Sequence, residues 1–465
     1  MFAIPGIVAL IILIYARPQE FVERLQAVPL LYVFFALALF GWLIDVRVKN
    51  THLSITPQLP WVALFFVWAS ASAMIQAKGD AFEQIMGLGI CVALFVLIAH
   101  GVQSFRGLHV VAATVLSMVL LVCGIGVHQG FAASGCVLID ESDPHDTSSG
   151  RADGRPCTTP RECYLGDAEP GGEYRCERIG LFGTTSIGGG RVRYRGVLQD
   201  PNELALAGAV GLPLAFAFDQ AERRSLARKM LSVLTLALVL LCAVLTGSRG
   251  GQLVFLIVLA AYFSKRVGVV GYLIGGVLAL PLLVLGGRGG DASSSTLERL
   301  DCWAEALSMW RDHPLLGVGL GQFGEYHYKT AHNSYLLALA ELGLPGMLLF
   351  GAIVYLSVKI PVAAIRHIER SRTHNPSPGE RVVRAWATGL IAAFAGLTVG
   401  IFFLSFTYHY VLWIYLGLCG AFYGALRRHD PTFRVTLHGR DLVAIALINL
   451  GVIVCAHLIV RWMVS

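Results

Sequence analysis

The stretch from Gly107 to Gly130, GLHVVAATVLSMVLLVCGIGVHQG, decides the fold class of this chain. It contains no Asp, Glu, Lys or Arg, and it is long enough to cross the hydrocarbon core of a bilayer as one α-helix. Similar apolar runs recur along all 465 residues, of which only 14% are charged. Soluble domains carry roughly a quarter charged residues. The sequence therefore predicts an all-α, polytopic membrane bundle that forms a single domain over residues 1–465.

The apolar runs define thirteen candidate membrane spans. They cover residues 2–16, 28–45, 58–76, 82–100, 107–130, 199–218, 230–247, 250–264, 267–286, 333–358, 385–405, 408–426 and 441–463. The first and eighth are short for a bilayer crossing, so we expect between eleven and thirteen transmembrane helices. The first run has no basic residue before it and no small-x-small cleavage site after it, which favours a retained helix over a signal peptide.

Basic residues in short connections predict how the chain is oriented. The connections 219–229, 359–384 and 427–440 are rich in arginine and lysine, and such loops face the cytoplasm in most membrane proteins. This orientation puts the N-terminus inside, and it puts the C-terminus and the two long loops, 131–198 and 287–332, outside. The net charge of +6 arises largely in short loops, and no basic run is interleaved with aromatic residues on a soluble segment. We therefore expect no nucleic-acid partner.

The first long loop, 131–198, carries four cysteines. Cys136, Cys157, Cys163 and Cys176 in an oxidising compartment predict two disulfides, for which three pairings are possible. A zinc site is the alternative, but the spacing of Cys157 and Cys163 exceeds the usual spacer between zinc ligands. The rest of the loop is polar and has no hydrophobic period, so we expect an irregular cap held by disulfides.

The second long loop, 287–332, is predicted to hold an amphipathic helix at the outer interface. Ser295 and Glu298 have the spacing of a capping box, and Pro314 would end the helix. The apolar positions at helical spacing are Leu297, Leu300, Ala304, Leu307 and Trp310. The glycine-rich run 317–321 follows no strand and lacks a Gly-Lys-Ser/Thr sequence, so we interpret it as a flexible turn rather than a nucleotide-binding loop.

Several polar groups are expected to reach the outer boundary of the membrane together. Arg193 and Arg195 precede Asp200, which could be a plain helix cap in front of Pro201. Arg249 lies in the tight hairpin Thr246-Gly247-Ser248-Arg249-Gly250-Gly251, between two apolar runs. It could extend to lipid phosphates, but we favour an anion ligand, with the glycines allowing close approach of the backbone.

The other polar candidates lie later in the chain. Arg299 is on the predicted amphipathic helix, where it could equally be part of a solvated face. His332 and Asn333 precede a span whose N-terminus would suit a phosphate, and Glu341 lies deeper in that span, where it could tune His332 or pair with another helix. Such a set fits a diphosphate held by arginines, with a histidine as proton acceptor. No cluster of carboxylates has metal-ligand spacing, so we expect neither a metal nor another cofactor.

These residues resemble the O-antigen ligase and Wzy-type polymerase superfamily. The matching stretches agree in order and spacing over residues 190–350, which we take as the ligase/polymerase-like core. They are Arg195 with Asp200-Pro201-Asn202-Glu203; Thr246-Gly247-Ser248-Arg249-Gly250; Arg299 with Trp303 and His313-Pro314-Leu315-Leu316-Gly317-Val318-Gly319; and His332-Asn333-Ser334-Tyr335-Leu336 continuing to Glu341-Leu342-Gly343. The first 190 residues match only in hydropathy, and the cysteine-bearing loop departs from the pattern.

The resemblance implies a fold like that of the GT-C membrane glycosyltransferases, in a bacterial inner membrane with the active site facing the periplasm. It implies an inverting, metal-independent transfer from an undecaprenyl-diphosphate-linked glycan to an acceptor sugar hydroxyl. Arg249 and Arg299 would bind the diphosphate, and His332 would act at the reacting centre. Arg195 would assist, and Arg193, Asn333 and Glu341 complete the candidate substrate-binding residues. The expected partners are the acceptor glycan, membrane lipids and a chain-length co-polymerase.

The sequence leaves the acceptor open. A polymerase joins one lipid-linked repeat to another, whereas a ligase transfers the glycan to lipid A core or to protein. We favour the polymerase, because the superfamily serves many surface polysaccharides and only some of them have a lipid A acceptor. A lipid or solute transporter is the alternative from another class, but the chain shows no inverted repeat.

Overall fold

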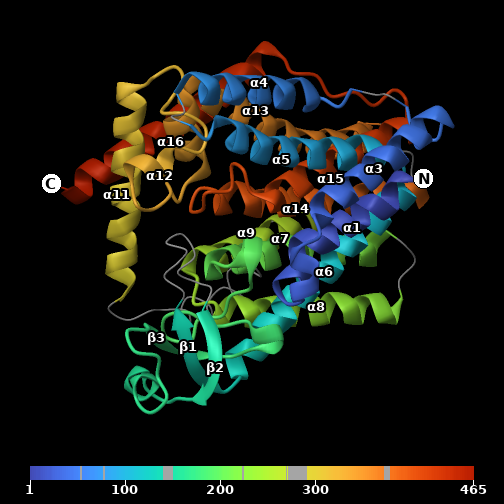
Figure 1. Cartoon of the computed structure of the whole chain (residues 1–465). Coiled ribbons are helices and arrows are strands. Elements are labelled where there is room, and N and C mark those ends of the chain that lie inside the picture. Colours follow the sequence, from blue (N-terminus) through green and yellow to red (C-terminus); the bar gives the residue numbers. More distant parts are fainter. Residues whose placement is uncertain are drawn as a thin grey trace.

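The computed structural model describes residues 1–464 except 53–54, 77–78, 140–149, 222–224, 269, 271–290 and 371–377. Within this part, ten helices are long and apolar enough to span a membrane, and most run side by side in one bundle (Figure 1). They are α3 (Leu30–Arg47), α4 (Leu59–Gln76), α5 (Ala81–Gly101), α6 (Phe105–Phe131), α7 (Pro201–Ala221), α8 (Leu226–Leu245), α13 (Ser334–Arg370), α14 (Pro378–Gly400), α15 (Tyr410–His429) and α16 (Gly439–Val464). Two shorter apolar helices are α1 (Ala3–Ala16) and α9 (Arg249–Val267).

Each of these twelve helices overlaps one predicted span, so the polytopic α-helical membrane fold is confirmed. The thirteenth predicted span, 267–286, lies almost wholly outside the described residues. The predicted connection 359–384 is shorter than expected, because α13 continues to Arg370 and α14 begins at Pro378. The short elements between the spans are η1 (Pro18–Glu20), α2 (Glu23–Gln26), η2 (Pro160–Tyr164), η3 (Leu181–Gly183), η4 (Gly196–Leu198), α11 (Asp291–Asp312) and α12 (Phe323–Tyr326).

The bundle has an inner set of helices and an outer shell. In the most apolar window of each helix, 83% of α7 and 89% of α15 is buried, but only 17% of α3 and 22% of α16. The outer helices instead expose large apolar side chains, such as Phe40 at 64% and Leu447 at 60%. A water-soluble protein rarely leaves so much apolar surface uncovered, so this shell is the lipid-facing surface of a multi-pass membrane protein.

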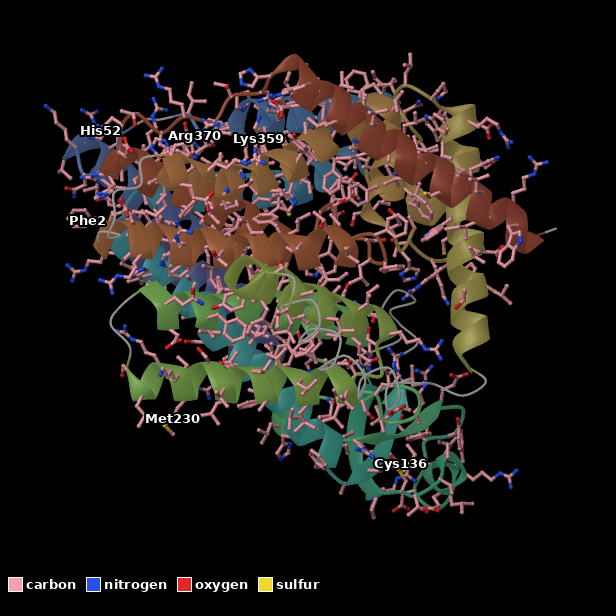
Figure 2. All side chains as sticks on the ribbon, turned by 180° about the vertical axis from the view of Figure 1, so that it is seen from behind. Phe2, His52, Cys136, Met230, Lys359 and Arg370 are labelled. Atoms are coloured by element: carbon pink, nitrogen blue, oxygen red, sulfur yellow. A yellow bond between two sulfur atoms is a disulfide. The ribbon has the colours of Figure 1, made fainter. Side chains whose placement is uncertain are left out.

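The two chain ends lie at opposite ends of the bundle. Figure 1 shows the N-terminus on one side and the C-terminus on the side of α11. Figure 2 places Phe2, His52 and Arg370 together at one end, with Cys136 toward the other. We call the end that carries residues 132–198 the sheet end. The start of α1 is fixed at the other end, where the Ala3 N–H donates to Asp45 Oδ2 at 2.9 Å.

The loop 131–198 is not the irregular cap that the sequence suggested. It contains a three-stranded antiparallel sheet, ordered β2-β1-β3, made of β1 (Ser134–Ile139), β2 (Gly150–Pro156) and β3 (Tyr174–Arg178). The polar composition hid the strands, because so small a sheet has little core for a hydrophobic alternation to mark. The two predicted disulfides are confirmed, and the pairing is Cys136–Cys163 and Cys157–Cys176.

The predicted amphipathic helix corresponds to α11, which runs across the sheet end at a steep angle to the spanning helices (Figure 1). It ends two residues before Pro314, as predicted. Its start was predicted wrongly, because α11 begins at Asp291 and Ser295 therefore lies inside the helix instead of capping it. Its buried face includes Leu300, Trp303 and Met309, and it packs against α13 and α16.

The glycine-rich run 317–321 is packed tightly and is not the flexible turn that the sequence suggested. At Gly343, which has φ +68°, α13 breaks, and the broken backbone is bridged by this loop. Val318 N–H donates to the Ala340 carbonyl at 2.9 Å, and Gly319 N–H donates to the Glu341 carbonyl at 3.0 Å. A Cβ at Gly317 would lie 2.2 Å from the Glu341 carbonyl carbon, so only glycine allows this approach.

Candidate functional site

The first part of the site is the start of α7. Asp200 Oδ1 accepts from the Asn202 N–H at 2.6 Å, and the Asp200 N–H donates to Glu203 Oε2 at 3.2 Å. These are the reciprocal bonds of a capping box, and Pro201 occupies the first helical position, where no N–H is needed. The interpretation of Asp200 as a helix cap is therefore confirmed. The other carboxylate oxygen of Asp200 is not used in this cap, so the carboxylate can also act on neighbouring charged groups.

A hydrogen-bonded link joins the start of α7 to the start of α9. Ser248 is the N-cap of α9, and its hydroxyl oxygen accepts from the Gly251 N–H at 2.9 Å. The same hydroxyl donates to Asn202 Oδ1 at 2.6 Å. A Cβ at Gly251 would lie 2.2 Å from Ala205 Cβ. This glycine therefore allows the starts of two helices to meet.

A small cavity at this junction brings Arg299 to the two helix starts. It is lined by Asn202, Leu206, Gly250, Gly251, Val254, Arg299, Gly400, Phe403 and Leu404. Arg299 comes from α11, and Gly250 follows directly after Arg249, which is the first residue of α9 and is exposed. The structure thus places the two predicted diphosphate ligands, Arg249 and Arg299, around one junction of α7, α9 and α11.

The electrostatic environment of His332 includes Arg299 and Asp200. Burial and the Arg299 guanidinium lower the pKa of His332, which precedes α13, while Asp200 acts in the opposite direction. The imidazole is therefore neutral at pH 7 and able to accept a proton. Its backbone has φ +47°, a conformation uncommon outside glycine that is often found at functional positions. Lys329 and Glu298, which form a 2.6 Å ion pair, also influence this histidine.

The N-terminus of α13 does not offer free N–H groups to a phosphate, contrary to our prediction. Asn333 Oδ1 accepts from the Tyr335 N–H at 3.0 Å and from the Leu336 N–H at 3.1 Å. The Ser334 N–H donates to the Ile401 carbonyl at 2.8 Å. The first turn is therefore satisfied within the protein, and Asn333 serves here as a cap. What remains for a ligand at this point is the helix dipole and the arginines.

The connection between α14 and α15 holds this helix start in place, and the sequence analysis missed it. Ser334 Oγ donates to the Leu404 carbonyl at 2.6 Å and accepts from the Phe406 N–H at 2.7 Å. His409 caps α15, and burial lowers its pKa to about 4. Its neutral ring donates from Nε2 to the Val197 carbonyl at 2.6 Å. Residues 401–409 are mostly apolar, so no sequence signal separated them from the adjoining spans.

Comparison with protein families identifies the segment that holds these groups. Residues 234–351 match the family model described as O-antigen ligase. We call this matched segment, residues 234–351, the O-antigen ligase domain. This domain runs from α8 to the first part of α13, so it includes Arg249, Arg299 and His332 and confirms the family resemblance. A comparison with curated proteins finds no match.

Two of the predicted substrate-binding residues precede the O-antigen ligase domain and are engaged elsewhere. Arg193 is buried, and its Nε donates to the Thr185 carbonyl at 3.0 Å, which holds the loop 131–198 to the bundle. Arg195 donates to the Gly183 carbonyl and lies over the Phe21 ring at 5.4 Å from its centroid. In this structure Arg193 and Arg195 are therefore bonded to backbone carbonyl groups of the chain.

Glu341, inside the O-antigen ligase domain, has a supporting position. It is 2% exposed, and its Oε1 accepts from the Phe323 N–H at 3.1 Å at the start of α12. The carboxylate therefore holds the segment 321–323, which leads to His332, and this contact to the start of α12 agrees with the second role weighed from the sequence, a pairing with another helix.

Among the described residues, one group of side chains has metal-ligand geometry, namely Cys136, Cys157 and Cys163. All three are in disulfides, so their thiolates are not available to an ion. The cationic side chains next to the junction of α7, α9 and α11 are Arg249 and Arg299. In the O-antigen ligase domain, guanidinium groups are the natural partners for a phosphate.

Proposed function

We propose that the protein is a membrane glycosyltransferase that transfers a glycan from undecaprenyl diphosphate to an acceptor sugar hydroxyl. The observation that supports this most directly is that Arg299 lies close enough to His332 to act on its pKa, both within the O-antigen ligase domain, and that Arg299 lines a cavity with Gly250, the residue after Arg249. Cationic groups beside a neutral base suit a reaction in which an anionic leaving group departs and a hydroxyl loses its proton.

The proposed step is a displacement at the anomeric carbon of the donor glycan. The acceptor hydroxyl oxygen forms a bond to that carbon as the bond from the carbon to the diphosphate oxygen breaks, which inverts the configuration. His332 takes the hydroxyl proton. Arg249 and Arg299 bind the departing diphosphate and neutralise the charge that develops on it. Undecaprenyl diphosphate is released, and the step needs no nucleotide or metal.

Asp200 adds a role that the sequence analysis did not assign. Its carboxylate stabilises the protonated form of His332, whereas Arg299 disfavours that form. When the imidazole takes the proton, the carboxylate partly offsets the new positive charge beside the arginines. We therefore propose Asp200 as a positioning and electrostatic partner of His332, in addition to its role as the cap of α7.

We favour polymerisation of lipid-linked repeats, assisted by a chain-length co-polymerase, in the inner membrane with the sheet end facing the periplasm. The two disulfides at the sheet end support this orientation, because disulfides persist in oxidising compartments. Deletion in the native host followed by gel analysis of surface glycans distinguishes the activities. Single repeats would persist without a polymerase, whereas long lipid-linked chains would accumulate without a ligase.

The site assignment is tested with purified protein in nanodiscs, supplied with donor and acceptor isolated from the native host. We expect His332→Ala and Arg249→Ala each to lower transfer by at least about a hundredfold, since each removes a group that acts in the transition state. Arg299→Ala should lower transfer in the same way, and Arg311→Ala is its matched control, because Arg311 shares α11 with Arg299 but its side chain is 77% exposed. Transfer at the wild-type rate by His332→Ala would reject the proposed base.

A further inference from the structure

An exposed aromatic ring on the segment that leads to His332 has no role in the mechanism above. Tyr328 is 74% exposed and lies four residues before His332. Four residues of fully extended chain span at most about 14 Å, so the Cα atoms of Tyr328 and His332 are no farther apart than this. The open face of the Tyr328 ring is therefore accessible to a substrate that reaches His332.

The Tyr328 ring is held in a fixed position by the residues on either side of it. The His327 ring packs against it, with centroids 4.6 Å apart and planes inclined by 32°, and the Lys329 ammonium lies 5.4 Å from the Tyr328 centroid. His327 is itself next to α11, since Cys302 Sγ lies 3.8 Å from His327 Nδ1. A ring that is fixed before a ligand arrives loses little conformational entropy when the ligand stacks on it.

Lys329 links this ring to α11, the helix that carries Arg299. Its ammonium forms a 2.6 Å ion pair with Glu298, the residue directly before Arg299. Lys329 and Glu298 both contribute to the electrostatic environment of His332. The Tyr328 ring is therefore attached to groups that adjoin both the proposed diphosphate ligand on α11 and the proposed base.

The surface around Tyr328 faces water and not lipid chains. The side chains of Lys329 and Glu298 are 35% and 45% exposed. Exposed charges of both signs are rare against the hydrocarbon region, where a charged side chain is costly. A tyrosine that only anchors a protein at the membrane interface would lie on the lipid-facing shell, away from the groups that surround His332. The open face of Tyr328 is therefore presented to a water-soluble part of a substrate.

We infer that Tyr328 is a stacking platform for a pyranose ring of the glycan, beside the site of transfer. One face of a pyranose carries C–H groups, and these are attracted to the negative face of an aromatic ring. This inference rests on the proposed glycosyl transfer and adds a specificity-determining residue to it. Donor glycan and acceptor glycan offer the same kind of face, so the experiment has an arm that distinguishes them.

The test measures transfer by purified full-length protein in nanodiscs, with donor and acceptor isolated from the native host. We expect Tyr328→Ala to raise the KM for a glycan substrate about five- to tenfold, with a smaller change in kcat, because one aromatic contact is lost. Tyr328→Phe and Tyr328→Trp keep the aromatic face, so their KM should stay within about threefold of wild type. Glycan released from its lipid has no leaving group and acts only as an acceptor analogue. A raised inhibition constant for released glycan assigns the ring to the acceptor, and an unchanged one together with a raised donor KM assigns it to the donor.

Undecaprenyl diphosphate without a glycan is the control probe, because it carries the leaving group and no sugar. Its inhibition constant should be unchanged in Tyr328→Ala. An equal rise in this constant and in the KM would mean that Tyr328 supports the site or anchors the protein in the membrane, and would overturn the inference. Tyr326→Ala is the matched variant, since Tyr326 is an exposed residue of α12 that has no ring or cation–π contact among the described residues. A KM raised as much by Tyr326→Ala would also overturn the assignment to Tyr328.

The inference and the proposed function can fail separately. Affinities for lipid-linked glycan and for the glycan-free lipid are also measured in the His332→Ala background, where binding requires no catalysis. If His332→Ala abolishes transfer but Tyr328→Ala leaves every KM and affinity at the wild-type value, the glycosyltransferase stands and the platform is rejected. If His332→Ala still transfers glycan but glycan affinity depends on Tyr328, the sugar site stands and the proposed base is wrong. Should Tyr328→Ala have a lowered thermal midpoint, Tyr328→Leu takes its place, because leucine keeps an apolar side chain without an aromatic face.

Discussion

Replacing Ser248 with alanine tests whether the hydrogen-bonded link between α7 and α9 places Arg249. Ser248 is fully buried, and its hydroxyl makes two bonds, one from the Gly251 N–H and one to Asn202. Losing the N-cap costs about 1 kcal/mol. Losing the hydrogen bond to Asn202 costs about 1 kcal/mol more. Because both bonds converge on the turn that carries Arg249, most of this energy bears on where its guanidinium lies.

The two losses together amount to about 2 kcal/mol. If all of this energy is lost from transition-state stabilisation at the site, kcat/KM falls about thirtyfold. We therefore expect Ser248→Ala to lower kcat/KM between about tenfold and thirtyfold. Ser248→Thr should retain most of the activity, because threonine supplies the same hydroxyl and is an accepted N-cap. The assay is glycan transfer in nanodiscs with donor and acceptor from the native host, alongside thermal unfolding of each variant.

The matched control is Ser264→Ala, toward the far end of α9. Ser264 donates to the Ala261 carbonyl at 3.0 Å and has no contact with Asn202. The Ser264→Ala variant also loses one hydroxyl from α9, but that hydroxyl is not part of the link to α7. Its effect on transfer should therefore be less than about twofold. If Ser248→Ala transfers glycan at the wild-type rate, or if Ser264→Ala loses as much activity, then the link between α7 and α9 does not position Arg249 and the reasoning is refuted.

Three other predictions follow from the site and its supports. Because burial and Arg299 lower the pKa of His332, the neutral base persists as pH falls, so kcat/KM should stay level down to pH 6.5 and decline only below it. Arg299→Gln should move that acid limb to higher pH in a pH–rate profile, and a wild-type limb at or above pH 6.5 would contradict the assignment. Replacing Cys157 and Cys176 with serine opens a crosslink with a sequence separation of 19, and chain entropy predicts a loss of about 3 kcal/mol in the stability of the sheet. Limited proteolysis should then cleave within the loop 131–198, and unchanged protection would argue against it. Gly317→Ala places a Cβ against the α13 backbone at a residue with φ +67°, so we expect at least about 2 kcal/mol of destabilisation and a lowered thermal midpoint, while an unaltered midpoint would contradict the packing described here.

Most of the helical framework could be predicted from the sequence, and the predictions that were wrong share a physical cause. Apolar runs determine spans because a bilayer excludes unpaired backbone, so each run must form a helix wherever the others lie. The spans of α6 and α15 illustrate this, since their limits differ from the predicted ones by only a few residues. The C-terminal end of the helix at α13 was predicted at residue 358, twelve residues too early. The helix continues beyond the apolar run through basic residues to Arg370.

The candidate site was predictable in kind but not in arrangement. Arg249, Arg299 and His332 were identified as charged or titratable groups next to apolar runs, and the structure brings the last two into one electrostatic neighbourhood. Arg193 has the same signal in the sequence, yet its guanidinium is bound to Thr185. A sequence pattern specifies residue types and spacing. It does not specify which carbonyl groups lie within reach once the loop has folded.

By itself, the sequence determined that the chain crosses a membrane many times, that its four loop cysteines form two disulfides, and that it carries the motifs of the O-antigen ligase domain. Only the tertiary structure decided the disulfide pairing, the capping of the α13 N-terminus by Asn333, the link from Ser248 to Asn202 and the cavity that Arg299 lines. The first set depends on local hydropathy and on residue type, which a single segment possesses on its own. The second set depends on contacts between residues far apart in the chain, whose geometry exists only when several helices have packed together.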